Sequence, residues 1–136
     1  MIITKASDYA ILTVSYLAAQ KRGALKSKMD ISRNLKLPKE FISKILQQLR
    51  DAGICESIRG KMGGYRLTKP AKKITFREVV EAMDGKFQFL ECFNDDFIDC
   101  GRTKLCQPMS SEVKIMEDKI KKLMDELHFG KIKVKV

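Results

Sequence analysis

The architecture follows from residues 54–68, Ile54-Cys55-Glu56-Ser57-Ile58-Arg59-Gly60-Lys61-Met62-Gly63-Gly64-Tyr65-Arg66-Leu67-Thr68. Two short runs in it, Ile54 to Arg59 and Tyr65 to Thr68, are typical of strands. The segment between them holds three glycines and one lysine. Because glycine adopts positive φ without strain, such a segment allows a tight turn and a close approach to another molecule. The stretch therefore predicts a basic β-hairpin.

Three helical segments are expected before this hairpin. The first spans Thr4 to Lys21 and ends at Arg22-Gly23, and Ser27 caps a short second helix. The third spans Lys39 to Asp51, and Pro38 suits its first turn. The apolar residues of the third helix recur at helical spacing, so its expected buried positions are Phe41, Ile42, Ile45, Leu46 and Leu49.

Three short helices followed by a basic hairpin are the plan of a winged helix-turn-helix, whose third helix enters the major groove of DNA. The expected fold is mainly α with a small β-hairpin wing, extended by a long C-terminal dimerisation helix. We expect residues 1–75 to form the winged helix-turn-helix domain. Residues 76–108 would form a connecting helix and a cysteine-rich loop, and residues 109–136 a dimerisation helix with a basic tail.

Positive charge is concentrated in one half of the chain. The 136 residues carry a formal net charge of +10, from 27 Lys+Arg and 17 Asp+Glu. Residues 1–75 hold 16 basic and 5 acidic residues, or +11, which leaves −1 for residues 76–136. A one-sided basic surplus indicates a polyanion-binding surface, most often for nucleic acid. Solubility alone is the alternative explanation.

The expected DNA contacts lie on the third helix, on the hairpin and just before the second helix. Lysine suits phosphates, whereas glutamine and serine can address base edges. An ordinary solvated helix face would look similar in isolation, and the hairpin with the one-sided charge favours DNA. The expected contacts are Lys26, Ser27, Lys28, Lys39, Glu40, Ser43, Lys44, Gln47, Gln48, Arg59, Lys61, Gly63 and Gly64.

The second half predicts two more helices, one from Thr75 to about Met83 and a last one starting at Ser110 or Ser111. Apolar residues of the last helix are separated by 3, 4, 3 and 4 positions, which is a coiled-coil seam. A seam this short is marginal alone, so we expect it inside a homodimer interface; burial within its own chain is the alternative. The tail from Lys131 to Val136 is expected to fray. The seam residues are Val113, Met116, Ile120, Leu123 and Leu127.

Four cysteines need an explanation. Cys55 lies in the first strand and is interpreted as a small structural residue, whereas Cys92, Cys100 and Cys106 lie within 15 residues of one another. Their spacers of seven and five residues do not fit a structural zinc site, and a disulfide scaffold does not suit a cytosolic chain. An iron–sulfur cluster and a thiol switch remain open, because clusters accept varied loops and a ligand other than cysteine.

In its order of motifs the chain resembles the IscR/NsrR family of bacterial iron–sulfur winged-helix regulators over nearly its whole length. Matching residues are Ser7-Asp8-Tyr9-Ala10, Leu49-Arg50-Asp51-Ala52-Gly53, the wing from Arg59 to Leu67, Ile74-Thr75 and the three cysteines before a long helix. The resemblance implies that Cys92, Cys100 and Cys106 ligate the cluster. It also implies a homodimer packed along the last helix.

The resemblance also bears on the fourth ligand. IscR-like members supply a histidine three residues after the third cysteine, where this chain has Met109, and its only histidine, His128, lies too far along. NsrR-like members supply an aspartate from the first helix of the partner subunit, and Asp8 matches that place. Asp8 can equally serve as a carboxylate near a helix N-terminus. The NsrR-like pattern favours a [4Fe–4S] cluster and nitric-oxide sensing, with a [2Fe–2S] form as the alternative.

The sequence thus predicts a cytoplasmic homodimeric repressor that binds a palindromic double-stranded operator under the control of a cluster sensing nitric oxide, redox state or iron. The alternative is a cluster-free thiol-redox winged-helix regulator. No nucleotide-binding glycine motif and no nucleophile–base set is present, so we expect neither an enzyme nor a small-molecule substrate. The longest mainly apolar stretch, Tyr9 to Ala19, is too short for a membrane span.

Overall fold

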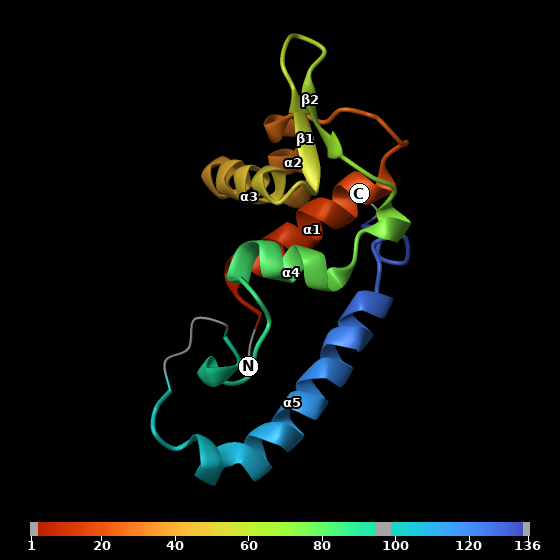
Figure 1. Ribbon diagram of the computed structural model, residues 1–136. Coiled ribbons are helices and arrows are strands. Elements are labelled where there is room, and N and C mark those ends of the chain that lie inside the picture. Colours follow the sequence, from red (N-terminus) through yellow and green to blue (C-terminus); the bar gives the residue numbers. More distant parts are fainter. Residues whose placement is uncertain (1–2, 95–98, 135–136) are drawn as a thin grey trace.

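The computed structural model describes residues 3–94 and 99–134 and contains five α-helices and one hairpin in that part of the chain (Figure 1). The order is α1, α2, α3, β1, β2, α4 and α5, with single 3₁₀ turns η1 and η2 before and after α4. The bounds are α1 Lys5–Ala19, α2 Lys28–Leu35, α3 Lys39–Asp51, β1 Cys55–Ile58, β2 Gly64–Leu67, η1 Ala71–Lys73, α4 Phe76–Asp84, η2 Glu91–Phe93 and α5 Thr103–Glu126. The winged-helix prediction is confirmed.

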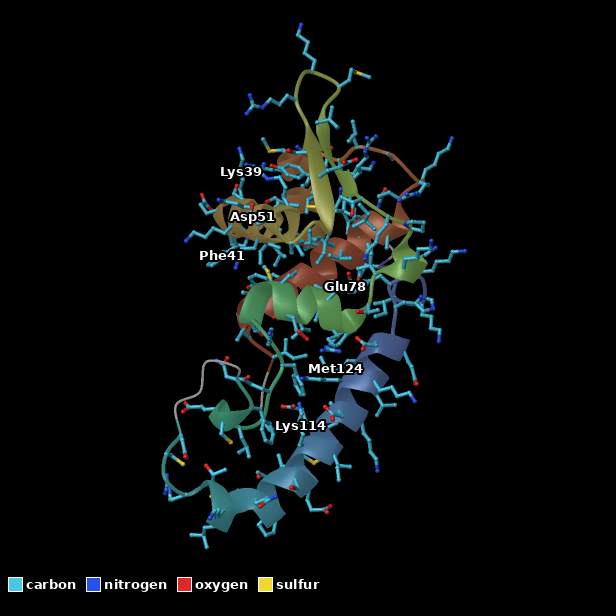
Figure 2. The ribbon with its side chains drawn as sticks, in the orientation of Figure 1. Lys39, Phe41, Asp51, Glu78, Lys114 and Met124 are labelled. Carbon is cyan, nitrogen blue, oxygen red and sulfur yellow. The ribbon has the colours of Figure 1, made fainter. Side chains whose placement is uncertain are left out.

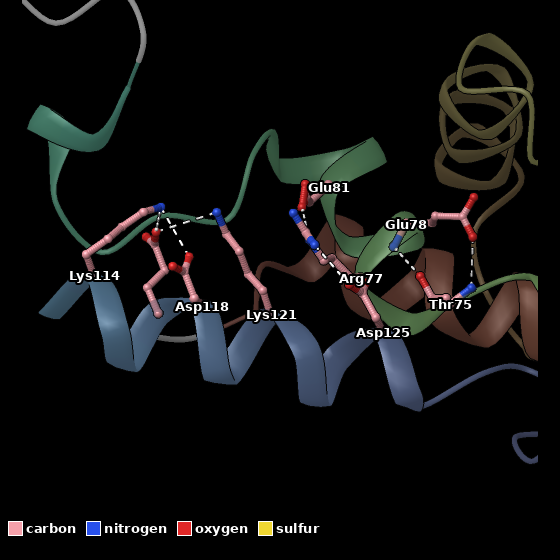
Figure 3. Close-up of polar contacts among 9 residues, drawn as sticks. Thr75, Arg77, Glu78, Glu81, Lys114, Asp118, Lys121 and Asp125 are labelled. Carbon is pink, nitrogen blue, oxygen red and sulfur yellow. Dashed lines mark hydrogen bonds and ion pairs between the residues drawn. The ribbon is translucent and has the colours of Figure 1, made fainter.

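Side-chain caps fix where two of the helices begin. The Ser27 hydroxyl accepts a hydrogen bond from the Asp30 amide at 3.0 Å, and the Asp30 carboxylate accepts one from the Ser27 amide at 3.3 Å. Thr75 and Glu78 form the same reciprocal box at the start of α4 (Figure 3). Each box satisfies two amides that the first helical turn leaves free. Both caps were expected from the sequence.

The core lies where α1, α2, α3 and α4 meet around the buried face of α1. Phe41 is a correction, because it is 51% exposed and touches Tyr9 edge-on with ring centroids 5.9 Å apart. It borders the buried stripe of α3 instead of joining it. The buried residues of α1 and α3 in this core are Ala10, Val14, Tyr16, Leu17, Ala18, Ile42, Ile45, Leu46 and Leu49.

The hairpin is antiparallel and is tied to the segment before α2. Lys26 and Tyr65 exchange two backbone hydrogen bonds, of 3.0 and 2.7 Å. Glycine is needed at the turn, because a Cβ on Gly63 would lie 2.0 Å from the Ile58 carbonyl oxygen. A Cβ on Gly64, whose φ is +151°, would lie 2.8 Å from the Lys26 backbone. Packing alone therefore accounts for both glycines, and their contact with DNA stays a prediction.

The last helix begins earlier than the sequence indicated. α5 starts at Thr103, not at Ser110 or Ser111, so it contains both Cys106 and Pro108. The Asp99 carboxylate accepts hydrogen bonds from the Gly101 amide at 2.9 Å and the Thr103 hydroxyl at 2.6 Å. This turn leads the chain into α5 ahead of Pro108. α1 is also slightly shorter than expected and ends at Ala19.

The segment after α5 returns to the core, so residues 131–134 are not frayed as expected, and residues 135–136 lie outside the described part of the chain. The Phe76 amide donates to the Leu127 carbonyl at 2.8 Å, and the Phe129 amide donates to the Ile74 carbonyl at 3.0 Å. Phe129 is fully buried, and Ile132 packs against the same core. The wing and the start of α5 thus lie at opposite ends of the molecule (Figure 1). Among residues 3–94 and 99–134, no helix combines the length and apolar character needed to cross a bilayer.

Candidate nucleic-acid interface and cysteine segment

α3 presents a polar face to solvent opposite its buried stripe. Five of the six side chains predicted on this face are exposed, and Ser43 is half-buried. In Figure 2 the labelled Lys39 lies at the side of α3 nearer the wing. Cations and amides on one exposed helix face fit the phosphates and base edges of a major groove. The exposed five are Lys39, Glu40, Lys44, Gln47 and Gln48.

The wing carries a second set of exposed cations beyond the core. Arg59 and Lys61 are both exposed, and the turn between the strands leaves Met62 with 89% of its surface exposed. Sequence reasoning missed Met62, although its place between the strands of a hairpin was the available signal. An apolar tip flanked by two cations can enter a minor groove while the cations bind the backbone.

The segment before α2 joins these two surfaces. Lys26 pairs with the wing through its backbone, and the Lys28 ammonium lies 6.0 Å from the centroid of the Tyr65 ring. The Ser27 hydroxyl already caps α2, although it retains its own proton to donate. The three residues thus hold the wing against the helix-turn-helix. Their contact with DNA stays a prediction.

Cys55 differs from the other three cysteines. It is 2% exposed, and its thiol donates to the Leu46 carbonyl with a sulfur–oxygen distance of 3.7 Å. Burial raises the pKa of the Cys55 thiol to about 12, so the thiolate is suppressed. The interpretation of Cys55 as a structural residue is confirmed.

Cys92, Cys100 and Cys106 lie outside the core. Cys92 is in η2, Cys100 precedes α5 and Cys106 is inside α5; the first two are exposed and the third is half-buried. All three are free thiols, which suits thiolate ligation chemically. Within residues 3–94 and 99–134, no three His, Cys, Asp or Glu side chains lie close enough to hold one metal ion. Three thiols are a suitable donor set for an iron–sulfur cluster. In the single chain they do not surround one common point.

Cys100 has the chemistry of a ligand or a nucleophile. Hydrogen bonds from the backbone and then the side chain of Arg102 lower the pKa of the Cys100 thiol. Cys92 lines an open cavity of about 390 Å³ with Phe93, Asp99 and Thr103, so it faces the start of α5. The lowered thiol pKa of the exposed Cys100 and the open cavity beside Cys92 leave both sulfurs accessible to metal and to oxidants.

Asp8 is exposed in the first turn of α1. The turn around it is held firmly, because Asp84 accepts hydrogen bonds from the Thr4 hydroxyl at 2.5 Å and the Ser7 hydroxyl at 2.7 Å. This contact links the start of α1 to the end of α4. Asp8 belongs to no group of potential ligands within the described part of this single chain. Its proposed role therefore requires a second subunit.

A buried carboxylate connects the cysteine segment to α5. Glu117 has no exposed surface, and it accepts a hydrogen bond from the Phe89 amide at 2.7 Å. The Lys114 ammonium lies 2.8 Å from the same carboxylate and 5.3 Å from the centroid of the Phe93 ring (Figure 3). We call Phe89, Phe93, Lys114 and Glu117 the Glu117 clamp. It positions the backbone on both sides of Cys92 against α5.

Sequence reasoning missed this clamp. The signal was an acidic residue directly after seam residue Met116, with lysines three residues before and four residues after it. Lys121 supplies the second lysine, with its ammonium 3.5 Å from Glu117. Burial raises the pKa of the Glu117 carboxyl, but hydrogen bonds from Lys114 and the Phe89 amide outweigh it and leave this pKa below its ordinary value.

The apolar face of α5 is largely uncovered in the single chain. Leu123 is 64% exposed, Met116 43% and Leu127 38%, whereas Val113 and Ile120 are half-buried. Leu127 caps the helix and lies just beyond its last residue. A row of exposed apolar side chains on a long helix is typical of a protein–protein interface.

The comparisons with known proteins decide the family. The model described as Rrf2, iron-dependent transcriptional regulator, matches residues 3–133. The chain belongs to the Rrf2 family. Protein aau3 of Rhizobium meliloti is 38% identical over 107 residues, which are 78% of this chain and 68% of that protein. The HTH-type transcriptional regulator NsrR of Bacillus subtilis is 30% identical over 106 residues, or 78% of this chain and 73% of that protein.

Solved structures confirm the fold. CymR of B. subtilis, titled the global cysteine regulator, superposes with a TM-score of 0.71 at 23% identity, covering 95% of this chain and 93% of that chain. T. potens IscR superposes with a TM-score of 0.70 at 19% identity, covering 95% and 83%. The resemblance found in the sequence is confirmed, and this Rrf2-family chain is a winged-helix transcriptional regulator.

Proposed function

We propose that this Rrf2 regulator is a homodimeric repressor whose operator binding is controlled by an iron–sulfur cluster. Cys92, Cys100 and Cys106 would hold the cluster, with Asp8 of the partner subunit as the fourth ligand. The observation that carries the proposal is the contrast among the thiols. Cys55 is buried in the core, whereas Cys92 and Cys100 are exposed and Cys106 is half-buried in α5, and the Glu117 clamp holds the segment around Cys92 on that helix. Bound there, the cluster would supply bonds that nitric oxide or oxygen can break.

The chain's own contacts offer a route from this segment to the DNA-binding surface. Gathering the three thiols would pull on the backbone around Cys92, which the Glu117 clamp attaches to α5. The other end of α5 is tied to α4 because Arg77 binds both Glu81 and Asp125 (Figure 3). α4 in turn holds the start of α1 through Asp84. The cysteine segment is thereby linked to α1 and α4, two of the helices that pack against α3.

Operator contact would use α3 in the major groove and the wing beside it. Lys39 and Lys44 would bind phosphates, while Ser43, Gln47 and Gln48 address base edges. Arg59 and Lys61 would follow the backbone or the minor groove from the wing. Replacing Lys44 with Ala should weaken binding to all sequences and reduce the slope of log affinity against log salt by about one unit.

The experiment that tests the cluster is anaerobic purification followed by absorption spectroscopy and iron and sulfide analysis, before and after nitric oxide. About four irons per subunit, lost or changed with nitric oxide, would support the [4Fe–4S] proposal, and about two would favour the [2Fe–2S] form. The variants Cys92→Ala, Cys100→Ala and Cys106→Ala should lose the cluster, whereas Cys55→Ala should keep it. An Asp8→Ala protein with unchanged cluster lifetime would exclude Asp8 as a ligand.

A cluster-free thiol-redox regulator is the second candidate. It is favoured by the lowered thiol pKa of the exposed Cys100. In that case the anaerobic protein would stay colourless after reconstitution with iron and sulfide. Mild oxidation would join two of the three cysteines in a disulfide and change DNA affinity. Mass spectrometry without reductant distinguishes the two candidates directly.

A further inference from the structure

A cavity of about 450 Å³ lies on the side of the molecule where the end of α1, strand β2, η1 and the segment after α5 meet. Its volume is within the range of small-ligand sites. It shares no residue with the predicted contacts of α3 or the wing tip, and none with the cysteine segment. The charged and titratable residues that line it are Lys21, Arg22, Arg66, Lys72, His128 and Lys133.

The charge of this cavity is uncompensated. Arg66 binds Glu56 across the hairpin at 2.7 Å, but no acidic side chain lines the cavity. Mutual repulsion of cations around one hollow is relieved when an anion enters it. Among the five cations that line the cavity, those without an ion pair to any described residue are Lys21, Arg22, Lys72 and Lys133.

The wall formed by the segment after α5 adds a polar atom without a partner. His128 Nδ1 is buried and makes no hydrogen bond with any described residue. The wall is tightly packed there, because a Cβ on Gly130 would lie 2.8 Å from this nitrogen. Since buried polar atoms in proteins are nearly always hydrogen-bonded, an unpartnered one beside a basic cavity points to a ligand or a water that completes it.

We propose that this cavity binds a phosphoryl group with at least two negative charges. Phosphate matches the site better than a single carboxylate, because four unpaired cations surround the space. Arg22 can bind two phosphate oxygens at once, and Lys21, Lys72 and Lys133 act as point charges. The group can belong to a free phosphate-bearing ligand or to a DNA backbone that runs past the wing. The proposal does not depend on the cluster.

Binding here would connect the wing to the end of α5. The cavity walls include Arg66 and Leu67 of β2 on one side and His128 to Lys133 on another. A bound phosphate therefore contacts both the hairpin that faces DNA and the segment that follows the proposed dimerisation helix. It would stabilise one orientation of the wing relative to α5.

The test uses inorganic pyrophosphate as the probe for the full-length protein at low salt, with isothermal titration calorimetry and thermal unfolding as readouts. We expect one site per subunit and a raised Tm. Lys21→Gln, Lys72→Gln and Lys133→Gln should each weaken binding about tenfold, as expected when one charged hydrogen bond is lost. Lys122→Gln, at an exposed position of α5, removes the same charge far from the cavity and should leave binding unchanged.

A second titration with duplex DNA of mixed sequence distinguishes the source of the phosphate. If pyrophosphate binds and the cavity variants keep the salt slope for DNA, the ligand is free in solution. If pyrophosphate does not bind but Lys21→Gln and Lys72→Gln lower that slope by about 0.9 each, the DNA backbone supplies the phosphate. If neither measurement distinguishes the cavity variants from Lys122→Gln, the proposal is wrong. It is also wrong if Lys44→Gln abolishes pyrophosphate binding and the cavity variants do not.

Discussion

The two halves of this regulator differ in how far they bury their own apolar side chains. In residues 3–84, the winged-helix head, apolar side chains from four helices and the hairpin bury one another, and the wing is fixed by backbone contacts with Lys26. In α5, Glu117 is the one fully buried residue that the structure describes, and Leu105, Met109, Ile115, Met116 and Leu123 are 43–81% exposed. The cysteines divide in the same way, with Cys55 inside and the other three outside.

This difference indicates which half is packed by its own contacts and which half requires a partner. The head buries most of its apolar side chains, with Phe129 added to its core from the segment after α5, and can present a fixed surface to DNA. α5 and the cysteine segment leave apolar side chains and thiols without partners in the single chain, which is the condition expected of a dimer interface and a ligand site. The proposed signal would act on α5 and the cysteine segment, which depend on partners. The response would be a change in DNA binding by the winged-helix head.

The largest expected difference concerns thiol reactivity. The pKa of Cys55 is about 12, whereas hydrogen bonds from Arg102 lower the pKa of Cys100 from its ordinary value, so at neutral pH the thiolate is far more populated at Cys100 than at Cys55. Timed alkylation with iodoacetamide and peptide mass spectrometry should find Cys100 modified quickly and Cys55 protected until the head unfolds. Arg102→Gln should slow Cys100 alone. Rapid alkylation of Cys55 in folded protein would contradict the division between the two halves.

The next difference concerns two leucines. Leu46 is fully buried in the head, so Leu46→Ala should lower the free energy of unfolding by about 2–5 kcal/mol. Leu123 is 64% exposed, so Leu123→Ala should change subunit stability by less than about 0.5 kcal/mol. If Leu123 is buried by a second subunit, the same variant should raise the dimer dissociation constant about tenfold or more. Urea unfolding and sedimentation equilibrium measure the two effects, and unchanged dimerisation would exclude this face as the interface.

Local sequence signals predicted the head better than the rest. α3 spans Lys39–Asp51 as expected, and the caps at Ser27 and Thr75 could be found because a capping box is complete within four residues. Phe41 was misplaced because helical spacing shows which side of a helix it occupies but not where the packed neighbour ends. Its contact with Tyr9 depends on how α1 crosses α3.

Outside the head, contacts distant in sequence decided the outcome. The start of α5 is the exception, because it depends on local bonds from Gly101 and Thr103 to Asp99, which lies before the helix. The tail packs because Phe129 reaches a core built from residues 10–80, which no local pattern shows. The same holds for the Glu117 clamp and the basic cavity. The three cysteines were found as a group from spacing and resemblance, while their arrangement in space could not be.

A smaller effect should follow from loosening the Glu117 clamp. Glu117→Gln keeps the size and removes the charge that Lys114 and Lys121 face, so we expect a loss of about 1–2 kcal/mol in unfolding free energy. The matched control is Asp118→Asn, whose side chain is 60% exposed and also contacts Lys114; it should cost less than about 0.5 kcal/mol. The alkylation rate of Cys92 should rise in Glu117→Gln and not in the control. Equal rates would show that the clamp does not position Cys92.

The smallest expected effect is the contribution of Glu117 to pH dependence. Although burial raises the pKa of its carboxyl, hydrogen bonds from Lys114 and the Phe89 amide leave it below the ordinary 4.5 in the folded chain. The folded state therefore binds the proton less tightly than the unfolded state does. Stability from this carboxylate is fully present above pH 4.5 and is lost as the pH falls through the lowered value.

The difference in unfolding free energy between the parent protein and Glu117→Gln should accordingly shrink as the pH is lowered from 6 towards 3. Because Asp30 and Asp99 titrate in both proteins, their lowered pKa values cancel in this difference. A difference that stays constant across the range would mean that the charge of Glu117 contributes nothing to holding the cysteine segment on α5.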